Sequence, residues 1–406
     1  MGPDADLANW ADPIFRKAVK WQRSSYSFLA TVLGFGASVR GAWLEASEET
    51  ERNMTEKLSL PLACTRTAVL ASLAALWCSL PAGAETIDQL YAMAKKEKTL
   101  VVWAADPTAG YEGAIRAFEQ QFPGITVSLT GGFNVLNAGI EEQVRTKKVN
   151  TDLVILQTIQ DFLAWNRRQL LLPFKPDGFD KVDTRSKDKD GAWIAVNRNP
   201  IFYGYNTEQV RRKDVPRLAT DFLRAQFKGR LISAFPADDV ASLFAFATIV
   251  RKYGWAYMDQ YMKQQPKFVQ GHLDVARSLG SGESLVSVSA TVSNTLDVQR
   301  AGGKVAIAAP ADDFLPVSFT AEAILKQAPH PNAAKLYVTW FLSKEWQSRA
   351  GVYSSRSDVP PPAGLPPLSS YRLEERYLEF VSSEDQITDL HKRFKSYVGP
   401  FAAVSR

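Results

Sequence analysis

Three short strand-like segments separated by two helical ones place the strongest limit on the fold of this 406-residue chain. Residues 100–104, 125–129 and 152–156 have the length and the β-branched or apolar content of buried strands. The stretches between them, residues 111–121 and 138–147, are predicted to be helices. Strands alternating with helices in this way predict an α/β fold, with a mainly parallel sheet covered by helices on both faces.

The loops that follow these strands carry small and polar residues. In a parallel sheet, ligands bind beyond the carboxyl ends of the strands, where neighbouring loops meet. Free backbone N–H groups near helix N-termini at this edge suit an anionic ligand. The alternative is that these loops are ordinary connecting turns. The binding residues predicted for this half of the chain are Asp106, Thr108, Gly131, Gly132, Gln157 and Thr158.

A second α/β pattern begins near residue 228. Residues 228–233, 284–289 and 304–310 are predicted strands, a long helix follows residues 235–240, and a shorter one covers 293–299. A chain of this length exceeds the usual single hydrophobic core, so two similar lobes are expected. The predicted lobes are residues 85–198 with 312–349, and residues 199–311 with 350–406.

Residues 54–84 have the composition of a secretory signal peptide. Basic residues come first, an apolar run at 68–80 follows, and Ala-Gly-Ala at 82–84 provides an A-x-A cleavage site. The apolar run is too short to span a bilayer, and the alternative of a short buried helix leaves the basic flank unexplained. We expect cleavage after Ala84. Residues 1–53 are then a non-native upstream extension from an unused start site, or else an atypical leader.

The cysteine content and the net charge limit which partners the exported chain can have. Both cysteines, Cys64 and Cys78, lie inside the signal peptide, so the exported chain is expected to fold without disulfides. The formal net charge of +5 is spread over runs such as residues 211–213 and 391–393. Such runs are usually solvated faces, and without a concentrated basic stripe no nucleic-acid partner is expected. A mild positive excess is compatible with an anionic small molecule.

Several stretches of the chain resemble one protein family. The sequence FYGYNTEQV at 202–210 and the Lys-Gly strand at 228–233 are similar to segments of bacterial extracellular solute-binding proteins of ABC transporters. Residues 328–347, which include His-Pro-Asn-Ala-Ala-Lys, resemble a helix pair of the iron, thiamine and spermidine branch, and residues 355–360 resemble the turn after it. The resemblance implies a two-lobe, type II periplasmic-binding-protein fold with hinge crossovers. It also implies a monomer in the periplasm that delivers a solute to an inner-membrane permease without a cofactor.

The second lobe separates two ligand classes. Relatives that bind ferric iron use neighbouring tyrosines there, because phenolate oxygen suits a hard cation. This chain has Ser-Val-Ser-Ala-Thr-Val-Ser-Asn at 287–294 and no adjacent tyrosine pair. These hydroxyls favour an organic anion with Arg198 as its charge partner, whereas ferric iron held by Tyr203 or Tyr205 remains the alternative. The binding residues predicted for this lobe are Arg198, Tyr203, Asp238, Ser289 and Thr291, although Asp238 or Asp239 equally suits a helix cap.

An exported enzyme on the same fold is the competing function. No G-x-S-x-G elbow, Walker loop or HExxH motif occurs in the chain. The three histidines, His272, His330 and His391, are each isolated in the sequence, and the position of His330 in a helix-start turn favours a structural role. We therefore expect a binding protein with no catalytic residue and no resident metal.

Overall fold

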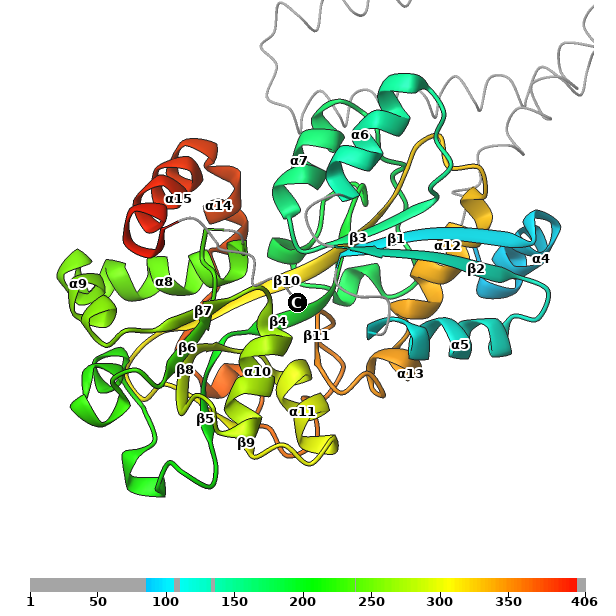
Figure 1. Cartoon of the computed structure of the whole chain (residues 1–406). Helices are drawn as coiled ribbons and strands as arrows, with labels where there is room; N and C mark the ends of the chain where they lie inside the picture. Colours follow the sequence, from blue (N-terminus) through cyan, green and yellow to red (C-terminus); the bar gives the residue numbers. More distant parts are fainter. Residues whose placement is uncertain (1–84, 106–109, 133–135, 238, 400–406) are drawn as a thin grey trace, which may run out of the picture. The chain divides into compact units, whose positions relative to one another are not determined.

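The computed structural model describes residues 85–399, except 106–109, 133–135 and 238. The described residues belong to one compact unit, which contains two β-sheets flanked by helices (Figure 1). The predicted signal peptide and the stretch before it lie outside the described residues. None of the helices within the described ranges is long and apolar enough to cross a bilayer.

The larger sheet has the strand order β11-β4-β10-β3-β1-β2, with β12 beside β10, and the smaller sheet has the order β7-β6-β8-β5-β9. The strands are β1 (Thr99–Ala105), β2 (Thr126–Gly132), β3 (Leu153–Leu156), β4 (Ile194–Pro200), β5 (Phe202–Asn206), β6 (Leu231–Ala234), β7 (Lys267–Val269), β8 (Val286–Ala290), β9 (Val305–Ala308), β10 (Leu315–Ile324), β11 (Tyr353–Ser354) and β12 (Leu373–Glu374). The helices are α4 (Ile87–Glu97), α5 (Glu112–Gln121), α6 (Leu136–Thr146), α7 (Ile159–Arg167), α8 (Val240–Tyr253), α9 (Trp255–Lys263), α10 (His272–Ser281), α11 (Val292–Arg300), α12 (Pro331–Phe341), α13 (Lys344–Gln347), α14 (Tyr377–Ser382) and α15 (Glu384–Val398).

The predicted strand and helix alternation between residues 100 and 156 is confirmed. β1 pairs in parallel with both β2 and β3. Helices α4, α5 and α12 cover one face of the larger sheet, where Leu90, Phe118 and Tyr337 belong to one apolar cluster. Helices α6 and α7 cover the other face with Ile140 and Phe162 (Figure 1). β3 is buried along its whole length and is entirely apolar, whereas the edge strand β2 has no buried residue and carries more polar side chains.

Antiparallel strands complete both sheets, which are therefore more mixed than the sequence predicts. The ten-residue strand β10 pairs antiparallel with β3 and β4, and β5 pairs antiparallel with β8 and β9. The sequence analysis did not identify β10, because it is buried along its whole length and has no alternating pattern. In the smaller sheet, α10 and α11 pack on one face and α8 and α9 on the other.

Two short C-terminal strands join the larger sheet, whereas the sequence predicts residues 350–406 in the second lobe. β11 pairs with β4, and β12 pairs with β10. Each strand has only two residues, so no sequence period reveals it. The predicted crossing points at 198/199 and 311/312 lie in the last part of β4 and between β9 and β10.

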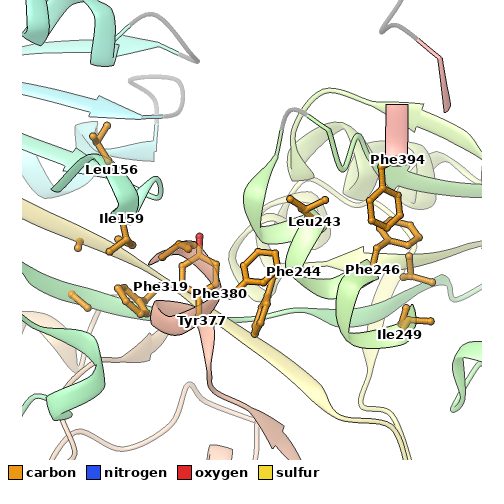
Figure 2. Close-up of a cluster of buried hydrophobic side chains, with 14 of the residues drawn as sticks. Leu156, Ile159, Leu243, Phe244, Phe246, Ile249, Phe319, Tyr377, Phe380 and Phe394 are labelled. Atoms are coloured by element: carbon orange, nitrogen blue, oxygen red, sulfur yellow. The ribbon is translucent and has the colours of Figure 1, made fainter. Parts of the chain in front are cut away.

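One aromatic cluster joins the C-terminal helices to elements of both sheets. Figure 2 shows Tyr377 of α14 between Phe319 of β10 and Phe244 of α8, with ring centroids 5.3 and 5.4 Å away. Phe380 lies 5.0 Å from Phe244 by the same measure. Tilted or edge-on ring pairs at such distances stabilise a core beyond the area they bury. The helix α14 therefore links the larger sheet to the main helix of the smaller one.

The family-like stretches near residues 330 and 356 hold both ends of α12 in place. The buried Asp152 carboxylate accepts from the His330 backbone N–H at 2.6 Å and lies 2.9 Å from His330 Nδ1. Arg356 makes two contacts of 2.9 Å with the Asp358 carboxylate and donates to the Leu342 carbonyl at 3.1 Å. The predicted structural role of His330 is confirmed by these contacts.

Glu322 of β10 is a buried carboxyl group. The residue is 0% exposed, and neither carboxyl oxygen has a hydrogen-bond partner among the described residues. Burial raises the pKa of Glu322 well above its ordinary value of 4.5, because the charged form loses its hydration. The folded state therefore favours the protonated form.

We expect Glu322→Leu to stabilise the protein by an amount that grows as the pH rises above 4.5. As the pH rises over this range, the unfolded chain loses the Glu322 proton before the folded chain does. The free energy of unfolding of the wild type therefore falls by up to about 1.4 kcal/mol per pH unit until the folded pKa is reached. Urea unfolding from about pH 5 to about pH 7 measures the difference. Glu112→Leu changes an exposed side chain of α5 and is the control, so its difference from the wild type should not grow with pH in this way. A wild-type-to-Glu322→Leu difference that stays constant with pH contradicts this account.

Candidate functional site: the strand ends of two sheets

The carboxyl ends of β1, β2 and β3 meet at one edge of the larger sheet (Figure 1). Ala104 of β1 pairs both with Gly131 of β2 and with Ile155 of β3. This register places four predicted binding residues at the same edge, namely Gly131, Gly132, Gln157 and Thr158. The other two predicted residues of this half, Asp106 and Thr108, lie outside the described residues.

Gln157 and Thr158 precede the N-terminus of α7. The Tyr377 hydroxyl donates to the Gln157 carbonyl at 3.1 Å, which ties this turn to α14. Asp161 in the first turn of α7 accepts a hydrogen bond from Asn137 of α6. Burial raises the pKa of Asp161 and outweighs the hydrogen bond that Asn137 supplies. The turn can therefore present backbone N–H groups to an anion, with less opposing negative charge from Asp161.

The carboxyl ends of β6 and β8, which run parallel, form the matching edge of the smaller sheet. Asp239 follows β6 and caps α8 by accepting from the Ser242 N–H at 2.6 Å, and it lies 3.4 Å from His272 Nε2. His272 Nδ1 lies 3.0 Å from the Ser289 carbonyl. Burial acts to raise the pKa of Asp239, but His272 and the Ser242 hydrogen bonds hold it below its ordinary value. His272, which is isolated in the sequence, thus contacts both Asp239 and Ser289 in the fold. Asp238 lies outside the described residues.

Ser289 and Thr291 differ in their access to this edge. Ser289 is 0% exposed, its Oγ lies 2.9 Å from Ser233 Oγ, and the same oxygen accepts from the Ala234 N–H at 3.0 Å. Thr291 is the N-cap residue of α11 and is partly exposed, with Oγ1 accepting from Asn294 at 3.0 Å. Thr291 is therefore available to a ligand at this edge, whereas the Ser289 hydroxyl is enclosed within the sheet.

Arg198 has a carboxylate partner within the protein. Its guanidinium is ion-paired with Glu375, which follows β12 and also pairs with Arg185 at 2.6 Å. The Arg198 side chain is 18% exposed, so this pair is partly shielded from water. A ligand would have to compete with Glu375 for Arg198, which sequence reasoning did not consider.

Tyr203 also contacts a buried carboxylate. Its hydroxyl donates to Asp313 Oδ2 at 2.8 Å, and burial together with the Asp313 charge raises the pKa of Tyr203 well above its ordinary value. Asp313 accepts three further hydrogen bonds, from the Ala219 N–H, Lys252 and Tyr253, each at 2.6 Å. Tyr203 therefore stays protonated and holds the segment between β9 and β10.

The described residues offer little support for a metal site. Across these ranges no group of three or more His, Cys, Asp or Glu side chains is placed to hold an ion. Of the two tyrosines that remain for ferric iron, Tyr203 donates to Asp313, and Tyr205 lines a separate cavity beside Arg212. Neither tyrosine lies among the residues at the two edges described above.

Residues 113–370 match the sequence profile of the family described as bacterial extracellular solute-binding protein. This match covers more than half of the chain. The chain belongs to this solute-binding family. The matched region includes the strand ends of both sheets from Gly131 to Thr291.

Solved structures with similar folds include three binding proteins. AfuA from Actinobacillus pleuropneumoniae, with exogenous fructose-6-phosphate bound, is 19% identical with a TM-score of 0.64, covering 74% of this chain and 98% of that one. Iron-bound HitA from Pseudomonas aeruginosa is 18% identical with a TM-score of 0.59, covering 73% and 99%. A substrate-binding protein of an ABC transporter from Agrobacterium tumefaciens is 14% identical with a TM-score of 0.62, covering 74% and 94%. These similarities show the two-lobe fold of periplasmic binding proteins.

One curated relative is an uncharacterized protein from Haemophilus influenzae. It is 25% identical over 192 residues, a stretch that covers 45% of this chain and 55% of the relative. The chain therefore spans about half the length of the curated relative that it matches.

Sequence reasoning missed the contribution of α14 and the pairing of His272. Tyr377 reaches Gln157 across 220 residues of sequence, and His272 meets Asp239 only after both loops are folded. The capping role of Asp239 was visible, because an Asp before a long apolar helix is a common N-cap. Nothing local marks Tyr377, which belongs to a stretch without diagnostic pattern.

We expect Asp239→Ala to destabilise the protein by about 1–2 kcal/mol, because it removes both the cap of α8 and the partner of His272. Asp239→Asn keeps a capping oxygen and should cost less. Asp297→Ala is the control, because the exposed Asp297 side chain of α11 pairs with Arg300 at 2.8 Å on the surface. This change should alter stability by less than about 1 kcal/mol. Urea unfolding measures all three variants. Equal losses for Asp239→Ala and Asp239→Asn would contradict the capping role.

Proposed function

We propose that this chain is the solute-binding component of an ABC importer. It captures a small organic anion between the strand ends of its two sheets and delivers it to a permease in the inner membrane. It acts in the periplasm once the signal peptide has been cleaved after Ala84. Residues 1–53 are not part of the mature protein. One chain supplies both sets of strand ends, which supports a monomer.

The observation that carries this proposal is the arrangement of helix N-termini on two sheets joined by paired crossovers. The N-termini of α7, α8 and α11 follow directly on β3, β6 and β8. β4 continues into β5 through Ile201, whose N–H donates to the Pro316 carbonyl at 2.8 Å beside the returning strand β10. Two lobes linked in this way can open and close around a ligand, and ligand contacts then shift the balance between the two states.

The groups at these strand ends favour an anion that also carries hydroxyl groups. Thr291 stands before α11, whose first N–H groups can donate to a phosphate or carboxylate. At α7 the Ile159 N–H already donates to the Gln157 carbonyl at 3.0 Å, so a ligand there would meet the N–H groups beside it. The Asp239 carboxylate beside His272 can accept from a ligand hydroxyl. The fructose-6-phosphate bound to the similar AfuA structure combines both features. Sugar phosphates are therefore the first ligand class to test.

Ferric iron is the second candidate, because the similar HitA structure is iron-bound. The described residues favour it less. Ferric sites need deprotonated oxygen ligands, whereas Tyr203 is held protonated by burial and by its hydrogen bond to Asp313. The organic anion therefore remains the better-supported ligand.

Catalysis is not part of the proposed function. Asp239 and His272 resemble two members of a hydrolytic triad, but no nucleophile completes it among the described residues. The nearby Ser289 meets His272 through its backbone carbonyl, and its hydroxyl is enclosed with Ser233 inside the sheet. A serine nucleophile needs its hydroxyl within reach of both the histidine and the substrate.

We expect thermal unfolding of the exported protein to shift upward with one class in a panel of sugar phosphates, carboxylates, polyamines and ferric citrate. A ligand present at a hundred times its Kd stabilises the folded state by about 2.7 kcal/mol. Thr291→Val and Asp239→Asn should weaken this stabilisation, because the first removes a hydroxyl at a strand end and the second removes the carboxylate charge that accepts from a ligand hydroxyl. Thr146→Val is the matched control, because Thr146 is exposed and its hydroxyl donates only to backbone carbonyls of its own helix, α6.

A flat response across the whole panel would contradict the proposed function. A shift that appears only with ferric citrate would select the second candidate. Loss of ligand stabilisation in Thr146→Val as well as in the two site variants would show that the effect does not arise at the strand ends.

A further inference from the structure

A second cavity lies beside β9, the edge strand of the smaller sheet. Its volume is about 480 Å³, within the range of small-molecule pockets. Its lining includes Phe202, Tyr205, Ile307 and Tyr371, together with the two arginines discussed below. None of its lining residues is among the strand-end residues of the proposed solute site. The cavity is therefore a separate feature of the fold.

The walls of this cavity come from the smaller sheet, from the segment that carries the arginines and from the C-terminal loop before β12. Phe202 and Ile307 belong to β5 and β9 of the smaller sheet. Tyr371 precedes β12, which pairs with β10 of the larger sheet, and its ring centroid lies 5.7 Å from that of Phe202. Apart from the two arginines, the side chains of the lining are aromatic or aliphatic, which gives an apolar ligand body a place to pack.

Two arginines give the cavity a positive charge. Arg212 and Arg217 line it and are exposed, and neither guanidinium has a hydrogen bond or ion pair with the described residues. The neighbouring Arg211, in contrast, pairs with Asp214 at 2.7 Å. No Asp or Glu belongs to the cavity lining. The charge of this pair is therefore not neutralised by the protein.

The backbone around Arg217 is held in place while its side chain remains available. The Arg217 N–H donates to Asp221 at 2.8 Å, and its carbonyl accepts from the Ala311 N–H at 2.8 Å. Ala311 lies between β9 and β10, so the turn carrying Arg217 is fixed against the second crossover. A fixed backbone lowers the ordering cost of placing a guanidinium on a ligand.

We propose that this cavity binds a small amphipathic anion, a carboxylate or phosphate monoester with a short apolar body. The anionic group pairs with Arg212 and Arg217, since guanidinium groups hold carboxylates and phosphates through paired N–H donors. The apolar body contacts Phe202, Ile307 and Tyr371. An occupant here also contacts Ala309, which follows β9 at the start of the second crossover.

Isothermal titration of the full chain with octanoate tests the proposal, with octanol and inorganic phosphate as probes of the apolar and anionic parts alone. Octanoate should bind more tightly than either. The double variant Arg212→Gln with Arg217→Gln should bind octanoate about tenfold more weakly or worse. The control double variant, Arg116→Gln with Arg300→Gln, removes the same charge from exposed side chains of α5 and α11. It should bind octanoate as tightly as the wild type does.

A second variant, Ala309→Trp, fills the cavity without changing charge and should also abolish octanoate binding. Thermal melts establish that each variant is folded. The proposal is overturned if the wild type does not bind octanoate, or if the Arg212 and Arg217 double variant binds it equally well. It is also overturned if octanol or phosphate alone matches octanoate. Because octanoate titration does not depend on the ligand panel used for the strand-end site, failure of one proposal can be told apart from failure of the other.

Discussion

The two crossovers between the sheets are hydrogen-bonded to each other, and the rest of the molecule is arranged around that pairing. β4 leads out of the larger sheet into β5, and β10 returns beside it, with Val317 opposite Pro200. Asp313, just before β10, is held by four hydrogen bonds from the smaller-sheet side. Burial acts to raise the pKa of Asp313, but these donors hold it below its ordinary value. The second crossover is thereby anchored to the smaller sheet at the point where β10 begins.

This constraint gives the strand ends their functional meaning. Each sheet supplies helix N-termini at its own edge, and neither edge alone surrounds a ligand. A short, well-anchored pair of crossovers lets the edges approach each other while each sheet keeps its internal register. The aromatic contacts of Tyr377 with Phe319 and Phe244 add a third link beside the crossovers. Solute capture by closure is the function that these links support.

Local sequence pattern was enough to predict the elements nearest the site. The strands and helices between residues 100 and 156 were predicted within a few residues, because each buried strand carries apolar residues and each break carries Gly, Pro or polar residues. The position of Asp239 before α8 was predicted for a related reason, because Asp is a common residue at a helix N-cap. Gly131, Gly132, Gln157 and Thr158 share one edge because parallel register requires it.

Contacts between distant residues could not be predicted in this way. Arg198 and Glu375 are 177 residues apart, and Tyr203 and Asp313 are 110 apart, so no local spacing reveals that these groups are already paired. Ser289 is polar in sequence, yet its hydroxyl is enclosed by Ser233 inside the sheet. Such pairs depend on which strands become neighbours, and local sequence does not show this: β10, for example, is buried along its whole length and has no periodic pattern.

Hydrogen exchange of the exported protein, with and without the stabilising member of the ligand panel, tests capture between two lobes most directly. Ligand binding should slow amide exchange at both edges, at residues 157–161 before and within α7 and at residues 291–295 at the start of α11. Amides on the outer faces of α4 and α15 should exchange at unchanged rates. Protection confined to one sheet, or absent from both edges despite ligand binding, would contradict closure around the solute.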